Sequence, residues 1–242
     1  MRIAVISDIH SNLNALEAVL GEVGAVDAVW HLGDTVGYGP QPQAVVDRLR
    51  AAGAIGVRGN HDDAGGGGAS IELFNPDGHR AMEWTRTQID ESTRLYLAGL
   101  PERRVPEGSS FTLVHGSPSD PIWEYLDSPE AAQANLAAFE TPYCLVGHTH
   151  VPLVFRESRG RMKKIVVDQE GRLALDGRRM ILNPGSVGQP RDGDPRSSFL
   201  LIDTNVGHVT WHRVEYDIAA TQAAIMAAGL PPHLARRLSS GR

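Results

Sequence analysis

Short apolar runs alternate with stretches of helical spacing in the first part of the chain. Arg2–Ile6 has the β-branched composition of a buried strand, and Asn14–Val23 carries apolar side chains three and four positions apart. Pro42 fits the first turn of a further helix. Further strands are expected at Ala28–His31, Ala54–Val57, Phe111–Val114 and Tyr143–Val146, with helical stretches between them. This alternation predicts a largely parallel sheet covered by helices.

After residue 150 the pattern changes to short strands separated by turns that contain glycine and charged residues. The expected strands are Val151–Glu157, Lys164–Asp168, Arg172–Leu175, Arg178–Leu182, Ser198–Asp203 and His208–Val214. Asp217–Ala228 and Pro231–Leu238 are expected as closing helices. Two sheets packed face to face, with helices outside, would bury both patterns in one core.

The chain is expected to form a single domain over residues 1–242, because no internal repeat and no sharp change of composition divides it. Asp62–Ser70, which contains Gly65–Gly68, is expected to be a mobile loop, either a plain flexible connection or a lid over an active site. The basic stretch Arg159–Lys164 is expected to be a solvated hairpin turn.

The composition is ordinary for a globular protein, with 41% hydrophobic and 21% charged residues. The net charge of −6 argues against broad binding to duplex DNA or to an anionic membrane. No apolar run reaches the roughly 18 residues of a membrane-spanning helix, and the N-terminus does not resemble a signal peptide. Cys144 is the one cysteine, so no intrachain disulfide can form and a cytoplasmic location is expected.

Potential metal ligands gather directly after the predicted strands. The candidates are Asp8, His10, Asp34, Asn60, His61, His115, His148 and His150. Ligands bind outside the carboxyl ends of strands in open α/β sheets, so these five loops can meet in one crevice. Two pairs, Asp8 with His10 and His148 with His150, are spaced two residues apart, and on extended backbone such side chains point the same way.

Imidazole nitrogen mixed with carboxylate and amide oxygen suits Mn, Fe, Zn or Ni better than Ca²⁺. Neither of the two pairs fills a coordination sphere alone. With Asp34 as a shared carboxylate, the candidates could hold two ions roughly 3.5–4 Å apart. Such a pair clamps a phosphoryl group and makes hydroxide available near neutral pH.

Five motifs resemble, in order and spacing, those of the calcineurin-like metallophosphoesterases. They are Asp8-x-His10, Gly33-Asp34, Gly59-Asn60-His61-Asp62, His115-Gly116 and Gly147-His148-Thr149-His150. The chain is most similar to the small bacterial and archaeal single-domain branch, which includes phosphodiesterases, phosphatases and diadenosine tetraphosphate hydrolases. VGYGPQP at 36–42 and NPGSVGQPRDGD at 183–194 also resemble that branch, whereas Ser11 replaces a glycine of many relatives. The resemblance implies an α/β fold, a four-layer α-β-β-α sandwich of two mixed sheets flanked by helices.

The resemblance also implies a role for each motif residue. Asp8, His10 and His150 are expected to hold the first metal, Asp34 to bridge, and Asn60, His115 and His148 to hold the second. His61 corresponds to the catalytic histidine of the family, which contacts the phosphate and protonates the leaving group or stabilises its charge. Asp62 is expected to orient His61. Manganese is the expected ion, with iron, zinc or nickel as alternatives.

Residues outside the motifs have less specific interpretations. Arg191 and Tyr38 are expected to contact substrate, and Arg196 is a weaker candidate. His31 and Cys144 are expected to be structural, and the tryptophans to lie in the core or at the rim.

The expected activity is hydrolysis of a phosphate ester of a nucleotide or other small molecule, by attack of metal-bound hydroxide. Diadenosine tetraphosphate hydrolase and protein phosphatase are alternatives at the same site. A non-catalytic binding module and a nuclease are less favoured. The oligomeric state cannot be predicted from the sequence.

Overall fold

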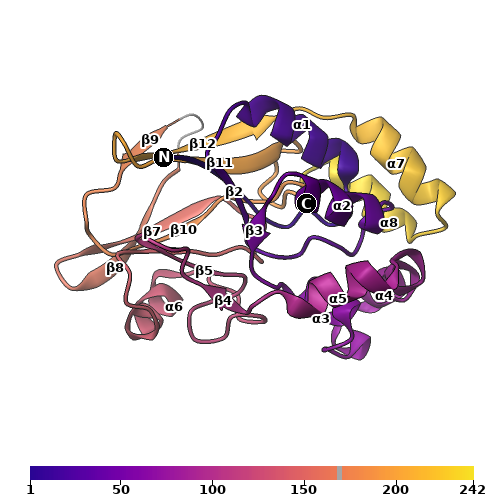
Figure 1. The fold of residues 1–242 in the computed structure, drawn as a ribbon, viewed down its shortest axis with the longest axis horizontal. Coiled ribbons are helices and arrows are strands. Elements are labelled where there is room, and N and C mark those ends of the chain that lie inside the picture. Colours follow the sequence, from indigo (N-terminus) through magenta and orange to yellow (C-terminus); the bar gives the residue numbers. More distant parts are fainter. Residues whose placement is uncertain (168–170) are drawn as a thin grey trace.

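The strands form two six-stranded sheets that lie face to face (Figure 1). The structure is a computed structural model that describes residues 1–167 and 171–242. The first sheet has the order β3-β2-β1-β11-β12-β9. Its strands are β1 (Arg2–Ile6), β2 (Ala28–His31), β3 (Ile55–Gly56), β9 (Arg172–Ala174), β11 (Ser197–Asp203) and β12 (His208–Val214).

The second sheet has the order β4-β5-β6-β10-β7-β8. Its strands are β4 (Arg103–Arg104), β5 (Phe111–Val114), β6 (Tyr143–Leu145), β7 (Leu153–Ser158), β8 (Arg161–Ile165) and β10 (Met180–Asn183). Strands β1, β2 and β3 pair in parallel, as do β5, β6 and β10, and the other pairs are antiparallel. Both sheets are therefore mixed, which confirms the expected fold class and limits the parallel part to three strands in each sheet.

Alternation along β1 explains how the layers are held together. Ile3 and Val5 pack into the core between the two sheets, while Ala4 and Ile6 pack outward against helices. Because both faces of this strand are covered, its sequence is apolar from Ile3 to Ile6. Burial of each large aliphatic side chain contributes about 1.5–3 kcal/mol to folding.

Helices cover the outer faces of both sheets (Figure 1). Helices α1 (Leu13–Val23) and α2 (Pro42–Ala51) pack on the first sheet, and α6 (Pro129–Ala134) packs on the second. Helices α3 (Asn60–Gly66), α4 (Pro76–Gln88) and α5 (Glu91–Gly99) form a separate group. Helix α7 (Ile218–Ala227) contacts α1, and α8 (Pro232–Arg236) follows it. Short 3-10 turns occur at Ile71–Leu73, Leu136–Ala138 and Arg237–Ser239. Within the described residues, no helix has the length and apolar character needed to cross a membrane.

The prediction of a mobile loop at Asp62–Ser70 is wrong for its first half, because helix α3 continues to Gly66. The glycines allow close packing: a Cβ atom on Gly66 would lie 2.8 Å from the backbone nitrogen of Ala98 in α5. Gly67 then ends the helix at φ +92°, a left-handed conformation that glycine adopts without strain.

The expected hairpin turn at Arg159–Lys164 is too long. Only Arg159 and Gly160 form the turn, and β8 begins at Arg161 and pairs with β7. The predicted strand Lys164–Asp168 is therefore shifted toward the N-terminus, and Asp168 itself lies outside the described residues.

Candidate metal centre

The loops that follow the parallel strands bring the seven expected ligands into one buried region. Their side chains are between 0% and 4% exposed. Those after β1 and β2 come from the first sheet, and those after β5 and β6 come from the second. The predicted convergence of these loops therefore occurs, at the edge where the parallel strands of both sheets end.

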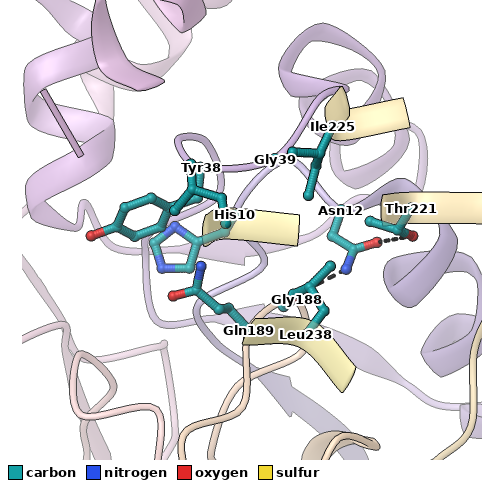
Figure 2. A pocket seen from close by; sticks show the side chains of 10 residues that line it. His10, Asn12, Tyr38, Gly39, Gly188, Gln189, Thr221, Ile225 and Leu238 are labelled. Carbon is teal, nitrogen blue, oxygen red and sulfur yellow. Dashed lines mark hydrogen bonds between the residues drawn. The ribbon is translucent and has the colours of Figure 1, made fainter. Parts of the chain in front are cut away.

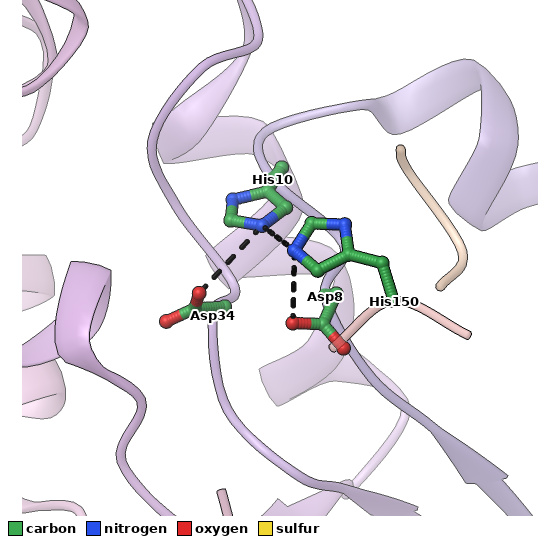
Figure 3. Close-up of side chains that lie close together, drawn as sticks. All are labelled: Asp8, His10, Asp34 and His150. Carbon is green, nitrogen blue, oxygen red and sulfur yellow. Dashed lines mark hydrogen bonds and ion pairs between the residues drawn. The ribbon is translucent and has the colours of Figure 1, made fainter. Parts of the chain in front are cut away.

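One group of side chains surrounds a point between Asp8, His10, Asp34 and His150 (Figure 3). Each offers one ligand atom, and these atoms all lie within 4.8 Å of one another. The Nε2 atoms of His10 and His150 are 3.1 Å apart. Nε2 of His10 is 3.6 Å from an Asp34 oxygen, and Nε2 of His150 is 3.4 Å from an Asp8 oxygen.

A second group shares Asp34 with the first. The ligand atoms of Asp34, His115 and His148 also lie within 4.8 Å of one another. Nε2 of His115 is 3.4 Å from Asp34 Oδ2, 3.0 Å from Nδ1 of His148 and 3.2 Å from the side-chain oxygen of Asn60. Asn60 thus completes a mixed nitrogen and oxygen set around this second point.

Backbone carbonyls fix which ring nitrogen of three histidines carries a proton. The pairs are His10 Nδ1 with Val36 O at 3.1 Å, His115 Nδ1 with Leu32 O at 2.7 Å and His150 Nδ1 with Gln189 O at 2.6 Å. A carbonyl oxygen only accepts, so each Nδ1 donates, and Nε2 of a neutral ring is left with a lone pair. Orientation of a histidine by its second nitrogen is typical of metal ligands.

The first group of side chains suits a cation better than protons. Burial, together with neighbouring positive charge, lowers the pKa of His10 and His150 well below the usual range, so their facing Nε2 lone pairs repel. Neither carboxylate oxygen of Asp8 has a hydrogen-bond partner, although both are buried. Burial raises the pKa of Asp8 to about 7. A divalent ion would satisfy all of these atoms at once.

Asp34 and His115 shift each other's pKa values in opposite directions. Burial opposes ionisation of Asp34, but His115 and His61 outweigh it and hold the pKa of Asp34 well below its usual range. Burial likewise opposes protonation of His115, and the Asp34 carboxylate outweighs it and raises the pKa of His115 to about 9. A bound ion would compete with the His115 proton for the same carboxylate.

The backbone at the ligands adopts conformations that side chains disfavour. Five of the seven expected ligands have positive φ values: Asp8 52°, His10 48°, Asp34 51°, His148 64° and His150 61°. Each such conformation lowers the free energy of unfolding by about 1–3 kcal/mol, and residues in such conformations cluster at functional sites of proteins. These five residues with positive φ values are thus among those whose side chains converge on the two ligand groups.

His61 and Asp62 occupy different environments. The His61 ring lies beside those of His10, Tyr38 and Phe74, at centroid distances of 4.8, 4.4 and 4.6 Å, and its Nδ1 lies 3.2 Å from Met82 Sδ. The Asp62 carboxylate instead accepts hydrogen bonds from backbone and hydroxyl groups of Thr35, Val36 and Gly59. These hydrogen bonds of Asp62 are thus with the loops around the site.

A pocket of about 190 Å³ opens over both groups of ligands. It is lined by Asp34, Tyr38, Asn60, His61, Leu73, Phe74, Asn75, Trp123, Tyr125, His148, His150 and Arg191. Tyr38 and Arg191, the two expected substrate contacts, are therefore at the pocket. Arg196, the weaker candidate, pairs with Asp194 at 2.6 Å.

Five pocket residues were not among the expected site residues, namely Leu73, Phe74, Asn75, Trp123 and Tyr125. The sequence does contain a signal for two of them, because the aromatic residues Trp123 and Tyr125 are separated by a single residue. Nothing in the local sequence relates that segment to Phe74.

Behind His10 lies a second, much smaller cavity of about 10 Å³ (Figure 2). Its volume is close to that of one water molecule, so it cannot hold a substrate. The Asn12 side chain here donates to Gly188 O at 3.0 Å and accepts from Thr221 of α7 at 3.2 Å. Asn12 thereby ties the loop after β1 to α7 and fixes the back wall of the site.

The remaining histidine and cysteine expectations concern residues outside the site. His31 and Cys144 are fully buried. His79 and His233 lie on the surface beside Glu83 and Asp77. His31 and Cys144 therefore have the structural positions that the sequence predicted.

Comparison with known proteins identifies the family. The calcineurin-like phosphoesterase superfamily domain matches residues 1–207. A metallophosphoesterase of Sphaerobacter thermophilus is 48% identical, with a TM-score of 0.91 over 100% of this chain and 99% of that one. MJ0912 of Methanocaldococcus jannaschii is 37% identical over 99% of this chain and 98% of its own length. Phosphodiesterase YfcE of Escherichia coli K12 is 28% identical over 85% of this chain and 89% of its own.

The family match extends over most of the chain and includes all five motifs. The family is metal-dependent, and the buried groups of aspartate and histidine side chains could bind metal. The chain therefore belongs to the calcineurin-like phosphoesterase superfamily and is, as the sequence predicted, a hydrolase of phosphate esters.

Proposed function

We propose that the chain hydrolyses a phosphate ester of a small molecule, with two divalent transition-metal ions as cofactors and the whole of residues 1–242 acting as one domain. Manganese is the ion that we expect. The observation that carries the proposal is the shared position of Asp34, whose carboxylate contributes to both groups of ligand atoms. The buried free thiol of Cys144 is consistent with the expected cytoplasmic location.

Each residue of the centre has a defined part in this proposal. Asp8, His10 and His150 would hold one ion, Asn60, His115 and His148 the other, and Asp34 would bridge them. Two such ions, when bound, attract phosphoryl oxygens and lower the pKa of water toward neutrality. The buried surroundings strengthen these electrostatic interactions because they exclude bulk solvent.

His61 is proposed as the catalytic histidine. Burial lowers the pKa of His61 to about 4, so the ring is neutral near pH 7. A neutral imidazole N–H can donate a hydrogen bond to an oxygen on which negative charge develops. The lowered pKa therefore favours stabilisation of charge over delivery of a proton from imidazolium.

Arg191 is proposed to bind phosphoryl oxygens. Its Nη2 donates to the neutral amide oxygen of Gln189 at 2.8 Å, which leaves the positive charge of the guanidinium for an anion. The guanidinium carbon lies 5.9 Å from the centre of the Tyr38 ring. Tyr38 would thus help to place Arg191 through a cation–π contact.

Removal of metal tests the activity directly. Protein stripped with a chelator should be inactive on p-nitrophenyl phosphate and bis-p-nitrophenyl phosphate, and Mn²⁺ should restore turnover. Full activity in excess chelator would contradict the proposal. A screen of the Mn²⁺-loaded protein on monoesters, cyclic nucleotides, dinucleoside polyphosphates and phosphoproteins would then separate the alternative substrate classes.

The assignment of His61 has its own test. His61→Ala should keep both metals, because the side chain is proposed as a catalyst and not a ligand, and should lose about 10²-fold or more of kcat. His79→Ala, at a surface histidine, is the matched control and should keep full turnover. Loss of bound metal from His61→Ala would overturn the assignment.

A further inference from the structure

One side of the pocket is built from three aromatic side chains, Phe74, Trp123 and Tyr125, which we call the aromatic wall. Phe74 lies between the 3-10 turn Ile71–Leu73 and α4, whereas Trp123 and Tyr125 precede α6. Two segments that are far apart in the sequence therefore contribute to the same wall. Phosphate binding does not account for this wall, because aromatic rings do not bind phosphoryl oxygens or metal ions.

The aromatic wall is continuous with the rings at the floor of the pocket. Phe74 packs edge-on against His61 with centroids 4.6 Å apart, and Trp123 packs against Phe74 at 5.6 Å. Tyr125 stacks on His148 at 4.0 Å with an angle of 23° between the rings. The substituent of a phosphate bound at the metal centre would thus contact the aromatic wall.

Polar anchors hold Trp123 and Tyr125 toward the pocket. Glu124, between them, accepts hydrogen bonds from Ser117 and from Asn135 on the protein side. The backbone nitrogen of Trp123 donates to Asp120 at 3.0 Å. The segment is therefore fixed without burial of its aromatic rings, and Tyr125 stays 54% exposed.

Aromatic side chains that line a pocket without being fully buried are typical of ligand-binding sites. The aromatic wall shares its pocket with His61 and Arg191, so the ligand must reach the phosphoryl site and touch the wall at once. A small molecule with a ring near its phosphate meets both conditions. Stacking on aromatic side chains accepts any flat ring, since every such ring has a π face.

We propose that the aromatic wall binds a flat aromatic ring carried by the ester group of the substrate, as in a nucleotide. The inference rests on the proposed phosphoesterase function and adds a substrate class to it. Phe74 and Trp123 supply the stacking surface, and Tyr125 closes the side above His148. Esters without a ring bind through the phosphate alone.

Matched phosphates test this inference. AMP and ribose 5-phosphate share the phosphate and the sugar and differ by the base, and phenyl phosphate offers a single ring. Binding to the Mn²⁺-loaded protein is measured by quenching of tryptophan fluorescence and by initial-rate competition against bis-p-nitrophenyl phosphate. We expect AMP, phenyl phosphate or both to compete about tenfold better than ribose 5-phosphate.

Variants locate the preference. Trp123→Ala and Phe74→Ala should bring the ring-bearing phosphates down to the affinity of ribose 5-phosphate, whose own affinity should not change. Trp123→Phe should keep the preference, because it keeps a stacking surface. Leu95→Ala, at a 64% exposed residue of α5 outside the pocket, is the control and should behave like the parent protein.

The outcomes separate this inference from the function on which it rests. Equal competition by all three phosphates, or a ring preference that survives both alanine variants, would overturn the inference and leave the hydrolase proposal intact. Absence of metal-dependent hydrolysis would instead defeat the hydrolase proposal. The fluorescence titration would still report whether rings bind at the aromatic wall.

Discussion

His31 shows how burial alone changes the chemistry of one residue. It lies in β2 with no exposed surface, and its Nε2 is 3.4 Å from the Tyr96 hydroxyl. A Cβ atom on Gly56 of the neighbouring β3 would lie 2.4 Å from the His31 ring, so glycine is needed for the two strands to pair. Burial, assisted by the charge of Arg104, lowers the pKa of His31 to about 4. The folded protein therefore keeps this ring neutral.

The lowered pKa of His31 predicts a loss of stability in mild acid. The unfolded chain takes up the proton near the ordinary pKa of 6.5, before the folded chain does. The contribution of His31 is thus complete above pH 6.5 and is lost as the pH falls toward 4. In urea unfolding of metal-free protein, His31→Phe should lose about 2 kcal/mol less than the parent protein between pH 7 and pH 5.

The control for this measurement is His233→Phe, whose side chain is 58% exposed. This variant should follow the parent protein at both pH values, because it changes a mostly exposed side chain and leaves His31 in place. Identical pH dependence in His31→Phe and the parent protein would show that His31 is not kept neutral by the fold.

At the scale of secondary-structure elements, Asp62 joins α3 to the loop that follows β2. Its carboxylate accepts hydrogen bonds from Thr35 N at 2.8 Å, Thr35 Oγ1 at 2.6 Å, Val36 N at 3.3 Å and Gly59 N at 3.1 Å. Thr35 directly follows Asp34, the residue shared by both ligand groups. Asp62 thus holds the backbone beside the proposed bridging carboxylate.

Asp62→Ala should lower both stability and metal affinity. The substitution leaves several buried donors without an acceptor, which should cost about 2–4 kcal/mol in urea unfolding of metal-free protein. It should also weaken Mn²⁺ binding in calorimetry, because the loop that carries Asp34 loses its anchor. Asp63→Ala is the control. Asp63 directly follows Asp62 and pairs with Arg58, so its removal should leave metal affinity unchanged. Loss of turnover with unchanged stability and metal affinity would instead support a direct effect of Asp62 on His61.

Local patterns in the sequence predict elements that have a regular period, and they miss those that depend on a distant partner. Strand β1 was predicted with its observed bounds, because its apolar run needs no outside information. Helix α3 was missed, because Gly65 and Gly66 weaken any local helix signal and become favourable only against α5. The two residues of β4 carry no strand pattern and pair only because β5 lies beside them.

On the scale of the whole molecule, the proposed centre joins the two sheets. Asp8 and His10 follow β1 of the first sheet, whereas His148 and His150 follow β6 of the second. The motifs predicted this meeting of loops because the carboxyl ends of parallel strands face the same way. The sequence could not predict the pocket wall opposite, since the position of Phe74 depends on how α3, α4 and α5 pack.

Because the ligands come from both sheets, bound ions should stabilise the entire fold. Mn²⁺ at about 100 times its Kd should add about 2.7 kcal/mol for each occupied site, and one such site raises the Tm of a protein of this size by about 5–10 °C relative to protein in chelator. We expect one transition, as for a single domain. His10→Ala and His148→Ala, which remove one ligand from each sheet, should each reduce the rise, and Arg191→Ala should keep it. A rise that both ligand variants retain would mean that the ions bind elsewhere, because each variant removes a side chain from one of the two ligand groups.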